Sequence, residues 1–377
     1  MTSRWAPAQL ARLRADTVGN TPVITSAQTA KMVEGLDLWD LGPVRTPAGA
    51  QAQVDGTWLW IGLSCLAEGD PAQRHERAVL RLLARGPDLR WLDLGPVFPA
   101  GAAHGNRQWA GSAVLDGDRI WVTYTAVGSS DPRVAHFRQR LFGAEAEVDR
   151  SSGEPRLVRW SLHSELFPPD PTRYDRADEN DGRPGFIKAF RDPFPFRDPA
   201  TTVQHVLFTA SLPSEQSRTD FNGAIGVARR TGAGWEVLDP LVTADGVNNE
   251  LERPHVLVHD SHYYLFFSTQ SRTFHPDVPA PTGLYGFVSN ELLGDYVPIN
   301  GHGAVFTNPP EQPLQAYSWM VLDDLTVHSF IDAHSLVGPW TDHLDVESIT
   351  SRREHFGGTL APPVRIELDG DRAWIAS

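Results

Sequence analysis

The sequence predicts an all-β fold built by radial repetition, that is, a β-propeller. Short stretches rich in β-branched and aromatic residues, bounded by turn residues, occur along most of the chain. The clearest are TWLWIGLSC (57–65), RIWVTYTAV (119–127), HVLFTASL (205–212), HYYLFFSTQ (262–270), LTVHSFIDA (325–333) and RAWIAS (372–377). Asp-Gly pairs or looser copies of them mark hairpin turns at Asp55, Asp116, Asp260, Asp323 and Asp369, spaced at roughly blade length. A β-sandwich or an irregular β domain is the alternative.

Helical periodicity is confined to two stretches. Residues 8–15 predict a short N-terminal helical segment, whereas residues 75–86 fit either a helix or a strand with a loop. No linker rich in Pro, Gly or Ser divides the chain, so we expect residues 1–377 to form a single catalytic domain.

Composition narrows the classes of partner. The chain has 377 residues, a net charge of −14, 41% hydrophobic and 21% charged residues, which fits a globular protein acting on a neutral substrate. Nucleic acid and anionic membranes are not expected as partners, because binding to phosphates requires clustered Lys and Arg. Cys65 is the only cysteine, which excludes an intrachain disulfide and a Cys-based zinc site. The first 17 residues lack the apolar core of a signal peptide.

Three acidic segments could carry chemistry. Asp40 follows Trp39 at a predicted strand end, and Phe-Arg-Asp-Pro occurs twice, at 190–193 and 196–199. Glu250 and Glu252 would face the same side of an extended strand, next to Arg253. Paired carboxylates beside arginines suit acid/base chemistry on a glycosidic bond, where one attacks and the other donates a proton. Taken singly, each could instead be a turn cap, an ion pair or a solvated loop residue.

Together these segments resemble glycoside hydrolase family 68, which contains levansucrases, inulosucrases and bacterial β-fructofuranosidases. The matching motifs follow the family's order: Trp39-Asp40, QWAGSA (108–113), Arg-Asp-Pro, ELERPH (250–255), LYGFVS (284–289), QAYS (315–318) and GGTLAP (357–362). Families 32 and 43 share the architecture and are the nearest competitors. The resemblance implies a five-bladed β-propeller with the acids at a central funnel.

The resemblance also implies roles for individual residues. Asp40 would be the nucleophile, Asp192 the transition-state stabiliser and Glu252 the acid/base. The expected substrate-binding residues are Trp39, Trp109, Arg191, Glu250, Arg253, Gln270, Arg272 and Tyr317. Of the two Arg-Asp-Pro copies, the first leaves room for a strand before the turn residues, so Asp192 is assigned to the site and Asp198 to the hairpin turn.

The implied activity is retaining fructosyl transfer from sucrose to sugar acceptors or water by double displacement. Three departures from the family pattern favour short-chain products over polymer: Leu41-Gly42 follows Asp40, Ala110 replaces a serine that supports the nucleophile, and Gln270 with Arg272 stands at an acceptor position. A β-fructofuranosidase that mainly hydrolyses sucrose is the alternative. A family 43-like hydrolase and a non-catalytic carbohydrate-binding propeller are further alternatives.

No cofactor is expected, and no metal. Asn249 stands where calcium-binding members of the family have an acidic residue. The expected partners are sucrose and fructosyl acceptors, and the oligomeric state is left open. The resemblance implies an extracellular enzyme, with a cytoplasmic location as the alternative.

Overall fold

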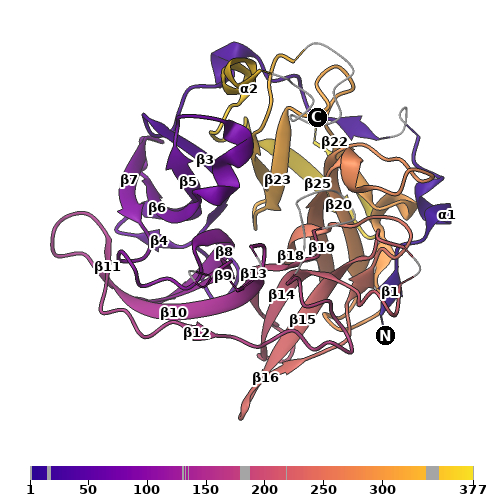
Figure 1. Ribbon diagram of the computed structural model, residues 1–377, viewed down its shortest axis with the longest axis horizontal. Helices are drawn as coiled ribbons and strands as arrows, with labels where there is room; N and C mark the ends of the chain where they lie inside the picture. The colour runs from indigo at the N-terminus through magenta and orange to yellow at the C-terminus, as the bar shows by residue number, and fades with distance from the viewer. Residues whose placement is uncertain are drawn as a thin grey trace.

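The structure is a computed structural model that describes residues 2–14, 18–129, 131, 133–134, 136–178, 187–217, 219–336 and 348–376. Within these residues, five β-sheets surround a central axis, each sheet forming one blade of a propeller (Figure 1). The predicted all-β, five-bladed architecture is therefore confirmed. No helix in the described ranges has the length and apolar character needed to cross a membrane.

The blades follow the order of the chain. Blade I contains β3 (Leu36–Pro43), β4 (Gln53–Val54), β5 (Thr57–Leu66), β6 (Val79–Arg85) and β7 (Trp91–Pro96). Blade II contains β8 (Arg107–Asp116), β9 (Arg119–Val127), β10 (Gln139–Asp149), β11 (Arg156–Val158) and β12 (Ser164–Glu165). Blade III contains β13 (Phe190–Arg197), β14 (Gln204–Ser211), β15 (Gly223–Thr231), β16 (Gly234–Val237), β17 (Val242–Thr243) and β1 (Ser3–Arg4). Blade IV contains β18 (Glu252–His259), β19 (His262–Thr269), β20 (Gly283–Ser289), β21 (Val297–Pro298), β22 (Ala304–Thr307) and β2 (Gly19–Asn20). Blade V contains β23 (Ala316–Val321), β24 (Thr326–Ile331), β25 (Val364–Asp369) and β26 (Arg372–Ile375).

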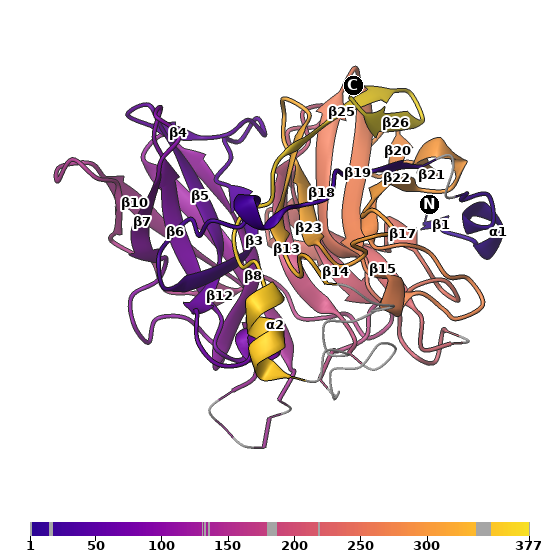
Figure 2. The ribbon, with the colours of Figure 1, turned by 90° about the horizontal axis from the view of Figure 1, so that it is seen from above.

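The N-terminal segment completes two blades. β1 pairs in parallel with β17, and β2 pairs in parallel with β22, so the chain's start lies along blades III and IV (Figures 1 and 2). Between them, Trp5 is fully buried among aromatic rings of blade IV, and its Nε1 donates to the carbonyl of His302. The predicted helical segment at 8–15 is a single turn, α1 (Pro7–Leu10).

The ambiguous stretch at 75–86 is a strand with a loop. Val79–Arg85 forms β6, which pairs with both β5 and β7, and the 3-10 helix η2 (Pro71–Glu76) precedes it. The helical interpretation is wrong here because hydrogen bonding to two neighbouring strands overrides the local apolar pattern. The other short helices are η1 (Ser26–Gln28), η3 (Ser271–Thr273), η4 (Ile299–Gly301) and α2 (Ile349–His355), the last of which packs against η2.

The five innermost strands share an irregularity that positions the site. Each first strand of a blade has a register shift, at Trp39/Gly42, Trp109/Gly111, Arg191/Phe194, Glu252/His255 and Tyr317/Met320. In four of these bulges a residue other than glycine adopts a positive φ: Asp40 (50°), Asp192 (58°), Arg253 (52°) and Ser318 (61°). Such backbone conformations are uncommon and cost energy, and they cluster at functional sites. The bulges turn these side chains toward the axis.

Candidate active site

One cavity of about 290 Å³ lies on the propeller axis at the bulged part of the inner strands. All eleven residues predicted for the site line it, so the structure brings together side chains spread over nearly 280 positions of the sequence. The cavity is also lined by residues that the sequence analysis did not single out for the site: Leu63, Ala72, Arg74, His75, Glu76, Ala110, Phe137, Ile187, Ser318 and Phe330. The roles assigned to the eleven predicted residues remain predictions.

Asp40 lies in the bulge of β3 and is partly exposed to the cavity. Removal from bulk water raises the pKa of its carboxyl, while the charge of Arg253 and a hydrogen bond from Ser318 act in the opposite direction. The charge of Glu252 raises the same pKa, which shows that the two carboxylates are close enough to interact. The ionised form of Asp40 is thus favoured by two cations, Arg253 and Arg74, and by one hydroxyl.

Asp192 occupies the bulge of β13 and is 7% exposed. Its Oδ2 accepts hydrogen bonds from Thr209 Oγ1 at 2.8 Å and from the backbone N of Arg253 at 3.2 Å. Burial raises the pKa of Asp192 to about 6, and the charge of Arg191 only partly offsets this. The carboxylate is therefore rigidly oriented but costly to ionise.

Glu250 and Glu252 share one arginine. Arg191 Nη2 lies 2.8 Å from Glu252 Oε1 and 3.6 Å from Glu250 Oε1, and the hydroxyl of Tyr317 donates to Glu252 Oε2. Burial, followed by the charge of Glu252, raises the pKa of Glu250 to about 7. Burial alone would lower the pKa of Arg191, but the surrounding carboxylates raise it above its usual value. Glu250 can therefore hold a proton next to Glu252, the expected acid/base.

Arg253 connects three inner strands. Its backbone N donates to Asp192 on β13, and its Nη1 donates to the carbonyl of Leu41 on β3 at 3.1 Å and to Ser318 Oγ on β23 at 2.9 Å. Burial lowers the pKa of this guanidinium, whereas the charges of Asp40 and Asp192 act in the opposite direction. Arg253 therefore fixes the relative positions of the bulges that carry Asp40 and Asp192.

The tryptophans form one wall of the cavity together with η2. The His75 ring lies edge-on to both Trp39 and Trp109, with centroid separations of 5.6 and 5.9 Å, and Trp109 Nε1 donates to the carbonyl of His75. Arg74 lies 5.8 Å from the Trp39 ring and pairs with Asp332 at 3.5 Å. This wall was not predicted, because His75 was interpreted as the start of a helix or strand pattern over 75–86 and Arg74 lies outside every motif.

The departures from the family pattern also lie at the cavity. Ala110 lines it from β8 and offers no hydroxyl to a neighbouring carboxylate. Ser318, on β23, is the hydroxyl that contacts Asp40. Gln270 and Arg272 line the rim around η3, directly after β19.

A lysine ammonium occupies an oxygen cage next to Glu250. Lys188 Nζ donates to the carbonyl of Asp220 at 2.6 Å, to Asn222 Oδ1 at 2.8 Å and to Asn249 Oδ1 at 3.2 Å. In the described part of the chain, no three His, Cys, Asp or Glu residues are grouped so that they could hold a metal ion. The Lys188 ammonium thus places a positive charge beside Asn249.

Comparison with known proteins agrees with this geometry. The levansucrase/invertase model of glycoside hydrolase family 68 matches residues 1–225 and 217–376. The chain is 30% identical to a levansucrase of Pseudomonas savastanoi pv. glycinea, covering 98% of this chain and 90% of that protein. It is 27% identical to an extracellular sucrase of Zymomonas mobilis subsp. mobilis, covering 98% and 91%. An inulosucrase from Halalkalicoccus jeotgali, solved bound to kestose, matches the fold with a TM-score of 0.91 at 36% identity, covering 100% of this chain and 95% of that one. This chain belongs to glycoside hydrolase family 68, the levansucrase/invertase family.

Proposed function

We propose that this protein transfers fructosyl groups from sucrose to sugar acceptors or water by a retaining double displacement. The observation that carries the proposal is the convergence of Asp40, Asp192 and Glu252, from three different blades, in one cavity. The three carboxylates have different hydrogen-bond and charge partners. Such differences are required when one carboxylate attacks, one donates a proton and one stabilises the transition state. The names of the levansucrase and inulosucrase relatives support sucrose as the fructosyl donor.

In the first step, Asp40 attacks the anomeric carbon of the fructosyl unit while Glu252 protonates the departing glucosyl oxygen. Arg253 and the hydroxyl of Ser318 favour the ionised form of Asp40 that attack requires. Tyr317 and Arg191 each bond one oxygen of Glu252 and so fix the direction of its proton transfer.

In the second step, Glu252 removes a proton from the acceptor, which attacks the fructosyl–Asp40 intermediate. Asp192 would hold fructosyl hydroxyls and stabilise the positive charge that develops on the sugar ring in both steps. Its double anchoring by Thr209 and the backbone of Arg253 supports this role, because a stabiliser must be oriented before the charge develops.

The acceptor decides the product. We propose short-chain transfer, because Ala110 leaves Asp40 without a hydroxyl from β8 and Gln270 with Arg272 forms the rim where acceptors would enter. Predominant hydrolysis is the second candidate, since the same departures would favour it. We also propose that residues 1–377 work as one domain, and that the protein acts outside the cell, as the name of the Zymomonas relative suggests.

Incubation with sucrose tests the proposal. We expect free glucose to exceed free fructose, with short fructo-oligosaccharides making up the difference, and Asp40→Asn to abolish release of both while leaving the melting temperature nearly unchanged. Equal release of the two sugars would instead identify a hydrolase. Release of neither sugar would reject sucrose as the substrate, and turnover by Asp40→Asn would reject the nucleophile.

A further inference from the structure

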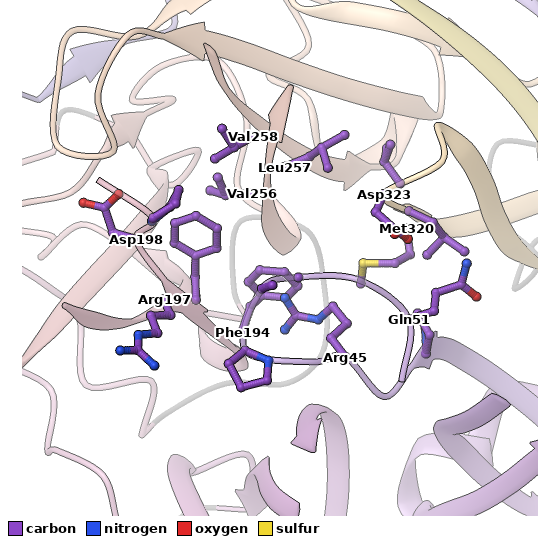
Figure 3. A pocket seen from close by; sticks show the side chains of 18 of the residues that line it. Arg45, Gln51, Phe194, Arg197, Asp198, Val256, Leu257, Val258, Met320 and Asp323 are labelled. Atoms are coloured by element: carbon purple, nitrogen blue, oxygen red, sulfur yellow. The ribbon is translucent and has the colours of Figure 1, made fainter. Parts of the chain in front are cut away.

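A second cavity, of about 440 Å³ and called the lower cavity below, lies beyond the bulges and is lined by none of Asp40, Asp192 and Glu252 (Figure 3). It shares no lining residue with the catalytic cavity. Its walls come from the later parts of β3, β13, β18 and β23, from the loop after β3 and from the turns after β13 and β23: Pro43, Arg45, Pro47, Ala48, Gly49, Gln51, Phe194, Phe196, Arg197, Asp198, Pro199, Thr202, Val256, Leu257, Val258, Met320, Val321, Leu322 and Asp323. Its volume is in the range of small-molecule sites.

Arg45 is the buried cation of this wall. It is 8% exposed, its guanidinium lies 3.6 Å from the centre of the Phe194 ring, and its Nη2 donates to the carbonyl of Pro195 at 2.9 Å (Figure 3). No carboxylate of the described chain forms an ion pair with it. Burial accordingly lowers the pKa of Arg45 to about 9, with no opposing charge.

Within the residues that the structure describes, every other buried arginine lies near a carboxylate. Arg74 pairs with Asp332, Arg107 with Glu76, and Arg191 with Glu252, at 3.5, 3.3 and 2.8 Å. Arg253 interacts with the charges of Asp40 and Asp192. A buried charge without a counter-charge is costly, so the exception at Arg45 indicates that an anion supplied from outside completes the site.

The acidic residues of the cavity do not fill this role. Both oxygens of Asp198 are used, accepting from Ala200 N, Thr201 Oγ1 and the Tyr263 hydroxyl, and Asp323 lies in the turn between β23 and β24. The negative charges of Asp198 and Asp323 disfavour a ligand that carries several negative charges. The remaining walls are mostly apolar, with Phe194, Phe196, Val256 and Met320 facing the space around Arg45.

We propose that this lower cavity binds a small organic monocarboxylate, whose carboxylate accepts from N–H groups of the Arg45 guanidinium that do not bond Pro195, and whose flat apolar body fills the space between Phe196, Val256 and Met320. A guanidinium presents donors in a planar fork that matches a carboxylate, and aromatic and aliphatic walls favour an apolar body. This inference does not depend on the reaction assigned to the catalytic cavity.

The test uses 2-naphthoate and its uncharged analogue 2-naphthamide in isothermal titration calorimetry on the full chain. We expect saturable one-to-one binding of 2-naphthoate, and binding of 2-naphthamide weaker by at least about tenfold, because the charged hydrogen bonds are lost. Arg45→Met should weaken 2-naphthoate to the level of the amide, whereas Arg90→Gln, at an exposed arginine that lines neither cavity, should leave its affinity within about twofold. A crystal containing 6-bromo-2-naphthoate should show the bromine in the lower cavity.

Several outcomes would overturn the proposal: no binding of 2-naphthoate to the wild-type chain, equal affinity for acid and amide, unchanged affinity in Arg45→Met, or bromine in the catalytic cavity. If Arg45→Met fails to fold, the acid/amide comparison and the bromine position, both measured on the wild-type chain, decide the matter.

Discussion

The two copies of Phe-Arg-Asp-Pro lie six residues apart around β13, and their aspartates meet opposite surroundings. Asp192 has a left-handed backbone and faces other carboxylates, and burial raises its pKa to about 6. At Asp198, burial alone would also raise the pKa, but hydrogen bonds from Thr201, Tyr263 and the backbone N of Ala200 lower it. An identical tetrapeptide is therefore strained at one end of the strand and relaxed at the other.

The arginines of the two copies differ in the same way. Arg191 is buried among three carboxylates, whereas Arg197 is exposed at the rim of the lower cavity. The copy that lines the catalytic cavity is thus held in place by its surroundings and contributes little stability itself. The turn copy stabilises the hairpin between β13 and β14.

The largest expected effect that tests this comparison is the loss of activity in Asp192→Asn. The amide keeps an acceptor for Thr209 but loses the charge opposite the developing positive charge on the sugar, so we expect turnover of sucrose to fall by about a thousandfold or more. Initial rates of glucose release measure the effect. Activity within tenfold of wild type would show that Asp192 is not the stabiliser.

The second prediction concerns pH and stability. Asp192 and Glu250 have folded-state pKa values of about 6 and about 7, above their usual values of 3.8 and 4.5. Between about pH 4 and about pH 7, the native state therefore binds more protons than the unfolded state. The free energy of unfolding should fall as pH rises through this range. Denaturant unfolding across this range should show the decline, and Asp192→Asn and Glu250→Gln should each flatten it; a rise with pH would contradict the account.

The third prediction concerns Lys188, two residues before β13 begins. Lys188→Met leaves three oxygens without their donor, which should cost about 1–3 kcal/mol. Chelators should not change the melting temperature of the wild-type chain, because the ammonium supplies the charge in this cage. Differential scanning calorimetry with and without EDTA checks both points. A fall in the melting temperature on addition of EDTA would reveal a bound metal ion, which this account does not include.

The fourth prediction concerns Ser318, which shares the left-handed bulge conformation of Asp192. Ser318→Ala removes the hydroxyl that contacts both Asp40 and Arg253, so we expect a fall in kcat of about tenfold to a hundredfold with KM little changed. Ala110→Ser, which offers a hydroxyl from β8, should restore part of the loss in the double variant. An equal loss of kcat and stability without rescue would indicate a merely structural role.

Much of this arrangement could be predicted from the sequence, because the signals are local. Strand composition and turn aspartates predicted the hairpins, and short motifs led to the eleven residues that line one cavity through the family resemblance that they carry. The two-residue strands β1 and β2 carry no periodicity, so their pairing with β17 and β22 could not be foreseen. The wall formed by Arg74 and His75 and the contact of Ser318 with Asp40 depend on how separate blades meet, which local patterns do not encode.

The smallest expected effect belongs to Asp198→Asn, the matched control for Asp192→Asn. The amide of the variant can still accept hydrogen bonds from some of the three donors, but it lacks the charge that strengthens those bonds. We therefore expect the free energy of unfolding to fall by about 1–2 kcal/mol. Activity should stay within about twofold of wild type. Because the pKa of Asp198 is lowered, its stabilisation is present above pH 3.8 and is lost as pH falls through the folded-state pKa. The difference in stability between variant and wild type should therefore vanish in acid, in contrast to Asp192→Asn, whose stability gain appears only as pH rises. If Asp198→Asn silenced the enzyme as Asp192→Asn should, the two copies would not have separate roles.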